Sequence, residues 1–387
     1  MKKLYEINIK KIYTVCLVFF PILSIYNLGI STLTLADALL IIVLPFCMWR
    51  LYKKRNQRIE KDNKLMGIAF LILIQTLIYY TIDIMSASNL FSALRILLYY
   101  FILAFFTKEL FDLQFGTNVY KKVSCFSAIL FIVQLVALKA FNVFIPGTLP
   151  WKSTCVDEYN NIMKNHAWTS SAYARPRSLF AEPSHLAVYM ALALAILLLC
   201  DKEKDWKKIV LITCAMLLSG SGMAIVLCLI IFLIFGLKNI KSLTNKKLIV
   251  IMIIGISFMP IFLYYIQSEP FKIFYKRTFI EQDSTKGRFG NFSDGFDINK
   301  DISKVIFGEG ISKIADIKGQ KYITSIPRIY KYFGIAGMVI FCILAINNFI
   351  KLRKKRLDCM ANIILHFVCK RNFISQFTFC LCTIYNC

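Results

Sequence analysis

Long, separated runs of apolar residues are the feature that most constrains the fold of this chain. A helix that crosses a bilayer needs roughly 17–25 mostly apolar residues, because the hydrocarbon core is about 30 Å thick. About ten such runs occur, and charged loops separate most of them. The pattern predicts an all-α, polytopic integral membrane protein with about ten transmembrane helices. The predicted spans are 12–30, 33–49, 65–83, 90–107, 121–141, 179–200, 205–219, 222–237, 248–267 and 327–350.

The basic residues predict the orientation of these helices. Lys and Arg outnumber Asp and Glu by 47 to 22, and they gather in alternate loops such as 50–64. The short loops 31–34, 84–89 and 219–222 contain no Lys or Arg. Because cytoplasmic loops carry an excess of Lys and Arg, the N-terminus is predicted to be cytoplasmic. The net charge of +25 therefore indicates orientation and attraction to anionic lipid, and no nucleic-acid partner is expected.

Two predicted external loops are long, 142–178 and 268–326, and the other loops are short. Loops beyond about 12–15 residues without periodic structure are usually functional or disordered. Aromatic residues, Pro and Gly among the charges favour a folded cap in both. We expect one transmembrane domain over 1–356, followed by a tail over 357–387 that has five of the thirteen cysteines and no assigned function.

Metal and disulfide chemistry are not indicated by the sequence. The cysteines are scattered through apolar runs, where Cys behaves as a small hydrophobic residue, and only Cys155 lies in a predicted external loop. His166, His185 and His366 show no spacing typical of metal ligands. We therefore expect neither a metal site nor a cofactor.

Several ionisable residues fall within the predicted spans, all in the outer half of the membrane. Such residues are rare and normally face a bundle interior or a wet cavity. Simpler interpretations remain open, because carboxylates can cap helix ends and long basic side chains can reach the headgroups. The first alternative applies to Asp37 and Asp83, and the second to Lys139 and Arg95. The complete set is Asp37, Asp83, Arg95, Lys139, Glu182 and His185.

The segment "RPRSLFAEPSHLAVYM" (175–190) opens the sixth predicted helix on the outer side. Arg175 and Arg177 precede this helix, and we expect them to converge with Arg95 and with Arg288 of the second long loop. Arginine suits bidentate contacts to phosphate, and a helix N-terminus adds free N–H groups. These residues predict a site for a lipid-linked phosphate or diphosphate. Alternatively, Arg175 and Arg177 only anchor the helix to lipid headgroups.

The same segment resembles the "R-x-x-x-x-F-x-E-P-S-x-x-A-x-Y" pattern of Wzy-type polysaccharide polymerases, which share a superfamily with the O-antigen ligases. "ADALLIIVLP", "LRILLYYFILAFF", "GRFGNF" and "YKYFGIAGMVIFCIL" are similar to further pieces of that family, in the same order from about residue 33 to about residue 350. "LLSGSGMAIVL" is similar to the family's tight hairpin, but it lacks the arginine usual there. That difference puts one basic contact of the family in doubt.

The resemblance implies an inverting glycosyltransferase at the outer face of a bacterial cytoplasmic membrane. It would transfer a glycan from undecaprenyl diphosphate to a lipid-linked repeat unit, and a chain-length regulator is a conceivable partner. Arg175, Arg177, Arg288 and Arg95 would bind the diphosphate. Glu182 would be the catalytic base, with His185 as a second candidate or a hydrogen-bonding partner. Alternatively, Glu182 only orients Arg177 through an ion pair.

Two other functions remain open. An O-antigen ligase would share the build, but "GEGISKIADIKGQKYITSIPRIYKYFG" contains no histidine where ligases carry one. A flippase or exporter of lipid-linked oligosaccharide would also need arginines in a cavity. Against it stand the absence of an internal repeat from the sequence and the restriction of polar residues to the outer half, because transporters place binding groups near the midplane. A polymerase is the favoured interpretation.

Overall fold

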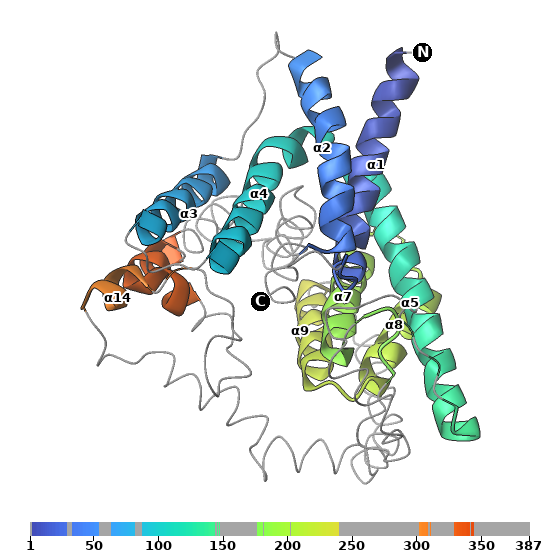
Figure 1. Ribbon diagram of the computed structural model, residues 1–387. Coiled ribbons are helices and arrows are strands. Elements are labelled where there is room, and N and C mark those ends of the chain that lie inside the picture. Colours follow the sequence, from blue (N-terminus) through green and yellow to red (C-terminus); the bar gives the residue numbers. More distant parts are fainter. Residues whose placement is uncertain are drawn as a thin grey trace. The chain divides into compact units, whose positions relative to one another are not determined.

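A computed structural model of the chain is drawn in Figure 1. The chain forms two compact units. The first comprises Met1–Ser221 with Ile311–Lys313 and Ile363–Cys387, and the second comprises Gly222–Gly310 with Ile314–Asn362. The predicted boundary between a transmembrane domain and a tail at residue 357 lies outside the described residues. The structure describes residues 2–28, 33–53, 63–81, 87–143, 145, 147, 176–180, 182–201, 203–239, 302–308, 310, 329–340 and 342–343.

The described part of the chain is mostly helical, as the sequence predicts. Its only extended pairing is an isolated bridge between Asn27 and Thr34. A π-helical turn, η2 (Ile196–Cys200), continues α7 without a break. The helices are α1 (Lys2–Leu23), α2 (Leu35–Lys53), α3 (Asn63–Thr81), α4 (Ala87–Leu110), α5 (Leu113–Phe141), α7 (Pro183–Ala195) and α8 (Trp206–Leu218) in the first unit, and α9 (Gly222–Asn239) and α14 (Ile302–Phe307) in the second.

Three of the described helical segments are long and apolar enough to cross a membrane. They are Leu35–Lys53, Leu113–Phe141 and Pro183–Cys200. Shorter apolar helices cover Met66–Thr81, Gly222–Gly236 and Ile329–Ile340. The described segments thus support a helical membrane protein, because a water-soluble bundle has little use for uninterrupted apolar helices of this length.

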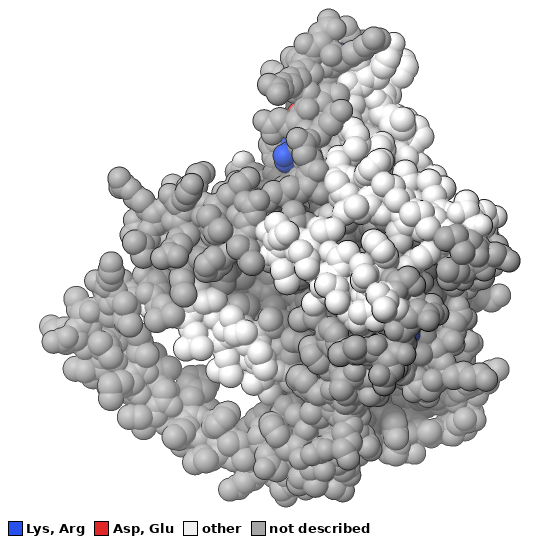
Figure 2. All heavy atoms as spheres, turned by 90° about the vertical axis from the view of Figure 1, so that its left-hand side faces the viewer, with Lys and Arg blue, Asp and Glu red and all other residues white. Residues whose placement is uncertain are grey.

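The surface of the described helices is apolar in a way that fits lipid contact. Large hydrophobic side chains stand exposed along one side of α3, among them Phe70, Ile74 and Leu77. On the face drawn in Figure 2, the described atoms belong almost entirely to uncharged residues, with a small area of Lys or Arg. Exposed apolar surface of this extent marks a contact with membrane or protein rather than with water.

The apolar runs predict most helices well, but α1 differs from its predicted span and α5 begins at Leu113, well before the predicted start at 121. The helices α2, α3, α4, α8 and α9 begin and end within a few residues of their predicted spans. The prediction of a first span over 12–30 is wrong at its C-terminal end, because α1 covers Lys2–Leu23 and residues 24–28 are not helical. It ends where the Ser24 hydroxyl donates to the Pro21 carbonyl at 3.0 Å, and the chain then turns toward the Asn27–Thr34 bridge.

Other predictions fall on residues that are not described. The span 248–267 lies outside the described residues, as do most of the loops 142–178 and 268–326. The described part of the second loop includes the short helix α14. Of the predicted span 327–350, residues 329–340 are described and helical.

Helices of the first unit pack in pairs that polar contacts reinforce. In Figure 1, α1 lies beside α2, and α3 lies beside α4. Tyr13 of α1 shares a 3.1 Å hydrogen bond with Thr107 of α4. The Asp112 N–H donates to the Thr14 hydroxyl at 3.0 Å, which ties the start of α5 to α1. Gly116 allows α5 to approach its neighbours closely, because a Cβ there would lie 2.7 Å from Phe111 Cζ and the Phe111 ring would have to shift.

α5 and α7 run antiparallel. Gln134 near the end of α5 contacts Ser178 just before α7, whereas Lys121 near the start of α5 contacts Asp201 just after η2. The two contacts bracket the pair of helices at opposite ends. Any group that stands before α7 is therefore held near the C-terminal end of α5.

In the second unit, two glycines allow a close backbone approach. Gly308, just after α14, and Gly334, within the helix 329–340, both have positive φ angles, 79° and 62°. A Cβ on Gly308 would lie 2.4 Å from the Tyr332 carbonyl. The Gly310 N–H donates to the same carbonyl at 3.1 Å. These glycines bind α14 to the following helix through main-chain contacts.

Candidate functional site at the start of α7

A tight turn over Arg177–Phe180 precedes α7. The Phe180 N–H donates to the Arg177 carbonyl at 3.1 Å. Ser178 within the turn has a φ of 55°, the left-handed region that costs energy for a residue with a side chain. The Phe180 side chain is fully buried. This turn places Arg177, which is half-buried, beside the helix start.

Glu182 and His185 lie together at the first turn of α7. Glu182 is the N-cap residue with extended backbone, and Pro183 follows at the first helical position, where proline is favoured. The Glu182 carbonyl accepts from the His185 and Leu186 N–H groups, both at 3.2 Å. Its carboxylate does not cap the helix. It accepts instead from the Ser184 hydroxyl at 3.0 Å and lies 4.0 Å from His185 Nε2.

Exposure separates these two side chains. The Glu182 side chain is 51% exposed and the His185 side chain is 16% exposed. Carboxylate oxygens can accept about four hydrogen bonds, and Glu182 is open to an incoming group. In chemical terms, the pair offers an accessible proton acceptor with an imidazole at its side.

A cluster of buried aromatic side chains anchors the segment that opens α7. Tyr189 of α7 stacks on Tyr120 of α5 with ring centroids 4.3 Å apart. The ring centroids of Phe180 and Tyr189 are 5.0 Å apart. The Tyr120 hydroxyl donates to the Tyr189 carbonyl at 2.8 Å. The Tyr189 hydroxyl donates to the Val18 carbonyl of α1 at 3.1 Å. These contacts hold helices α1, α5 and α7 together close to the turn over Arg177–Phe180.

A second polar cluster lies between α2 and α4. Asp37 is 2% exposed, and one carboxylate oxygen accepts from both the Thr34 N–H and the Thr34 hydroxyl at 2.8 Å. The Tyr99 hydroxyl donates to the other oxygen. Arg95 Nη1 lies 3.9 Å from the carboxylate, and its guanidinium stands over the Tyr99 ring. Asp37 thus pairs locally and begins α2, which is one of the two alternatives left open by the sequence.

The structure therefore distributes the predicted site residues between two places. Arg177, Glu182 and His185 share the segment that opens α7, whereas Arg95 belongs to the Asp37 cluster. Arg175, Arg288 and Asp83 lie outside the described residues. Lys139 is exposed near the end of α5.

Two contributing residues were missed by the sequence analysis. Gln134 accepts from the Ser178 N–H at 2.8 Å, and Tyr99 holds Asp37. The sequence contains a feature that could have indicated each of them. Gln134 is the only polar residue between Ser127 and Lys139, and Tyr99 follows Arg95 by four residues, which puts both on one face of a helix.

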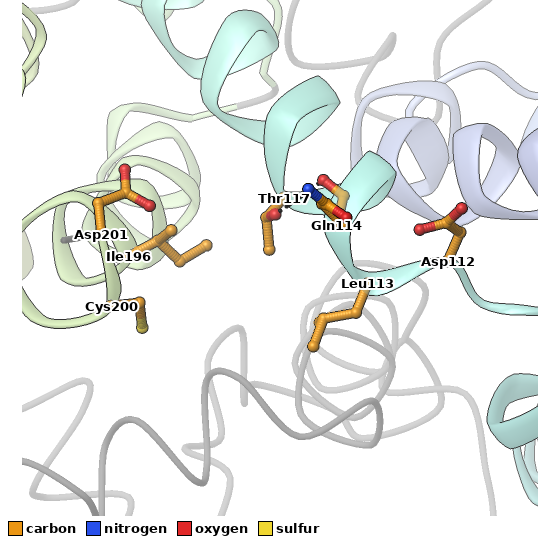
Figure 3. A pocket seen from close by; sticks show the side chains of 7 residues that line it. All are labelled: Asp112, Leu113, Gln114, Thr117, Ile196, Cys200 and Asp201. Carbon is orange, nitrogen blue, oxygen red and sulfur yellow. Dashed lines mark hydrogen bonds between the residues drawn. The ribbon is translucent and has the colours of Figure 1, made fainter. Parts of the chain in front are cut away.

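A pocket of about 440 Å³ lies at the other end of α5 (Figure 3). Ile196, Cys200 and Asp201 lie on one side of it, with α5 residues across from them. Its carboxylates are already engaged, because Asp201 pairs with Lys121 at 2.8 Å and Asp112 accepts from the Phe115 N–H at 3.0 Å. We assign it no ligand. The full lining is Asp112, Leu113, Gln114, Thr117, Ile196, Cys200 and Asp201.

Metal binding gains no support within the described ranges, where no group of three or more His, Cys, Asp or Glu side chains could hold an ion. Comparison with known protein families, curated proteins and solved structures finds no match for this chain.

Proposed function

We propose that the chain is a polysaccharide repeat-unit polymerase of a bacterial cytoplasmic membrane. In this proposal about ten helices cross the membrane, the N-terminus is cytoplasmic, and the loops 142–178 and 268–326 face outward. The enzyme transfers a glycan from undecaprenyl diphosphate to a second lipid-linked repeat unit. No cofactor takes part, and a chain-length regulator is a candidate partner. The resemblance of the segment 175–190 to the Wzy-type polymerases supports this assignment.

The observation that carries the proposal is the open carboxylate of Glu182. It stands 51% exposed beside His185, at the head of a helix that is buried along almost its whole length. Ionisable residues in membrane-spanning segments are rare and usually have a function. An exposed acid at the membrane surface is well suited to accept a proton from a sugar hydroxyl.

The chemistry is a single displacement at the anomeric carbon of the donor. The Glu182 carboxylate takes the proton from the acceptor hydroxyl, whose oxygen forms the new glycosidic bond. The bond between the anomeric carbon and the diphosphate oxygen breaks, and its electron pair leaves with undecaprenyl diphosphate. Because attack is opposite to the leaving group, the configuration inverts. His185 supports Glu182 from the same face of the helix.

The departing diphosphate develops negative charge that cationic groups stabilise. Arg177 fits this role best, because it stands in the turn that leads to Glu182. Arg175 and Arg288 join it in the proposal as groups of the outer loops. Arg95 has a smaller part in this proposal, because its charge is already paired with Asp37.

The test is polymerisation in vitro. Purified protein is incubated with the undecaprenyl-diphosphate-linked repeat unit isolated from the host strain, and the products are separated on a gel. We expect a ladder from the wild type and none from Arg177→Ala or Glu182→Ala. The control is Lys139→Ala, an exposed cation near the end of α5, which should form the ladder normally.

Other results would assign the alternatives. A single product carrying the glycan on lipid A–core would identify a ligase. Movement of the substrate across proteoliposome membranes without any new glycosidic bond would identify a transporter. Either result contradicts the proposed polymerase.

A further inference from the structure

Gln134 connects α5 to the turn before α7 across 44 residues of sequence. Its side chain is 3% exposed, and its Oε1 accepts from the Ser178 N–H at 2.8 Å. The amide is the only polar group in an apolar stretch of the helix. A buried polar group that loses its partner costs about 1–3 kcal/mol, so this contact determines where the turn lies against α5.

Gly147 completes the contact from the first long loop. A Cβ at this position would lie 1.4 Å from the Ser178 carbonyl oxygen and 2.7 Å from Gln134 Nε2. No side chain fits, and the loop backbone therefore rests directly on the other two residues. We call Gln134, Gly147 and Ser178 the Gln134 junction.

The junction holds a strained residue in place. Ser178 has a φ of 55°, and such left-handed residues persist only when the surroundings hold them, often near functional sites. Here the Gln134 bond holds Ser178, and the buried Phe180 side chain holds the end of the turn. Arg177 directly precedes the strained position and Glu182 follows within one further turn of chain.

We propose that Gln134 is a positioning residue for the diphosphate-binding and proton-accepting groups of this site. It acts through Ser178 and sets the direction in which Arg177 and Glu182 leave the turn. The inference rests on the proposed function for the reaction that is served, whereas the contact itself is independent of that function.

Three substitutions at one position separate positioning from packing. Gln134→Leu keeps the volume and removes the acceptor, and Gln134→Asn keeps an amide but is too short to reach. Gln134→Glu, as the neutral acid that burial favours, retains an accepting oxygen at the same reach. The matched control is Gln114→Leu, an exposed glutamine of the same helix. With the undecaprenyl-diphosphate-linked repeat unit as probe, we expect kcat to fall about 100-fold for the Leu and Asn variants, because misplacing reacting groups by 1 Å costs about that much. The Glu and control variants should polymerise near the wild-type rate.

A second measurement does not require any polymerase activity. A Leu179→Cys probe in the turn, on a Cys155→Ser background, is labelled in intact cells with a membrane-impermeant maleimide. Leu179 is half-buried, so we expect slow labelling that accelerates about tenfold with Gln134→Leu, since a lost buried hydrogen bond frees the turn. Gln134→Glu and Gln114→Leu should leave the labelling rate unchanged.

The two measurements separate the possible failures. Unchanged labelling in Gln134→Leu would show that the junction does not hold the turn. Faster labelling with wild-type polymerisation would show that the turn needs no positioning, and it would overturn the inference. If the wild type forms no polymer, the proposed function fails and takes the catalytic part of the inference with it, while labelling still decides whether Gln134 holds the turn.

Discussion

Two carboxylates near helix starts have opposite surroundings in this protein. Asp37 at the start of α2 is 2% exposed and is surrounded by Thr34, Tyr99 and Arg95. Glu182 at the start of α7 is 51% exposed, and its carboxylate contacts Ser184 and His185. The residue types and their positions on the helices are similar, yet one acid is enclosed and the other is open.

We interpret the difference as one between a structural acid, Asp37, and the acid that we propose to be functional, Glu182. An enclosed carboxylate in an apolar protein must be fully compensated, because removal from water costs several kcal/mol per ion. Asp37 meets this demand with donors from Thr34, just before α2, and from Tyr99 of α4, and it links these two helices. Glu182 remains in contact with solvent and keeps oxygens available to a ligand. We therefore expect substitutions to lower stability in the first cluster and activity in the second.

The largest effect on stability is expected for Asp37→Ala. The change leaves the Arg95 charge buried without its carboxylate, and breaking such a pair costs about 3–5 kcal/mol. The free energy of unfolding, measured by SDS titration in mixed micelles, should fall by this amount. Glu203→Ala, an exposed acid of the first unit, is the control and should change it by less than about 0.5 kcal/mol. An Asp37→Ala protein as stable as the wild type would break the comparison.

A smaller loss is expected for Tyr99→Phe. The substitution deletes only the hydroxyl that donates to Asp37, and a hydrogen bond to a charged group contributes about 1.5–3 kcal/mol. The same SDS titration measures it. Tyr80→Phe is the matched control, because Tyr80 is exposed on α3. If both variants unfold alike, Tyr99 does not hold the enclosed acid.

The Lys121–Asp201 pair gives an intermediate case. Its side chains are 17% and 26% exposed with the charged atoms 2.8 Å apart, so water screens part of the attraction. Lys121→Met should lower the free energy of unfolding by about 0.2–1 kcal/mol, and added salt should reduce the difference from the wild type. A loss as large as that of Asp37→Ala would show that exposure does not govern the energetics of these pairs.

The smallest effect on stability is expected for Glu182→Gln. The amide keeps the shape and can still accept from the Ser184 hydroxyl, so the free energy of unfolding should change by less than about 0.5 kcal/mol. Polymerisation should fall about 10²–10⁴-fold, the usual contribution of a general base. A Glu182→Gln protein that unfolds much more easily would move Glu182 into the structural class with Asp37.

Local patterns in the sequence predicted the helices better than the contacts between them. Long apolar runs predicted where α3, α4 and α8 lie, because a helix satisfies its own backbone hydrogen bonds in an apolar medium. The end of α1 was missed because it depends on one serine hydroxyl and the preceding Pro21 carbonyl. The predicted span 179–200 begins four residues before α7, whose first residue is Pro183, a residue type that suits the first helical position.

The pairing of distant polar residues could not be predicted in the same way. Asp37 and Arg95 are 58 residues apart, and the sequence left open whether Arg95 lines a ligand site or reaches for headgroups. Only the fold, in which α2 and α4 both contact α1, brings the two within 3.9 Å. Likewise, the contact of Gln134 with Ser178 depends on the antiparallel arrangement of α5 and α7. A lone glutamine in an apolar run signals a partner without identifying it.

A paired measurement on one variant separates the proposed role of Glu182 as the base from any role in stability. Wild-type and Glu182→Gln proteins are purified in parallel, and each preparation is divided between SDS unfolding and polymerisation of the undecaprenyl-diphosphate-linked repeat unit. We expect equal unfolding curves, a ladder from the wild type, and a rate at least about 100-fold lower from the variant. A Glu182→Gln protein that forms the ladder at the wild-type rate would contradict the assignment of Glu182 as the base.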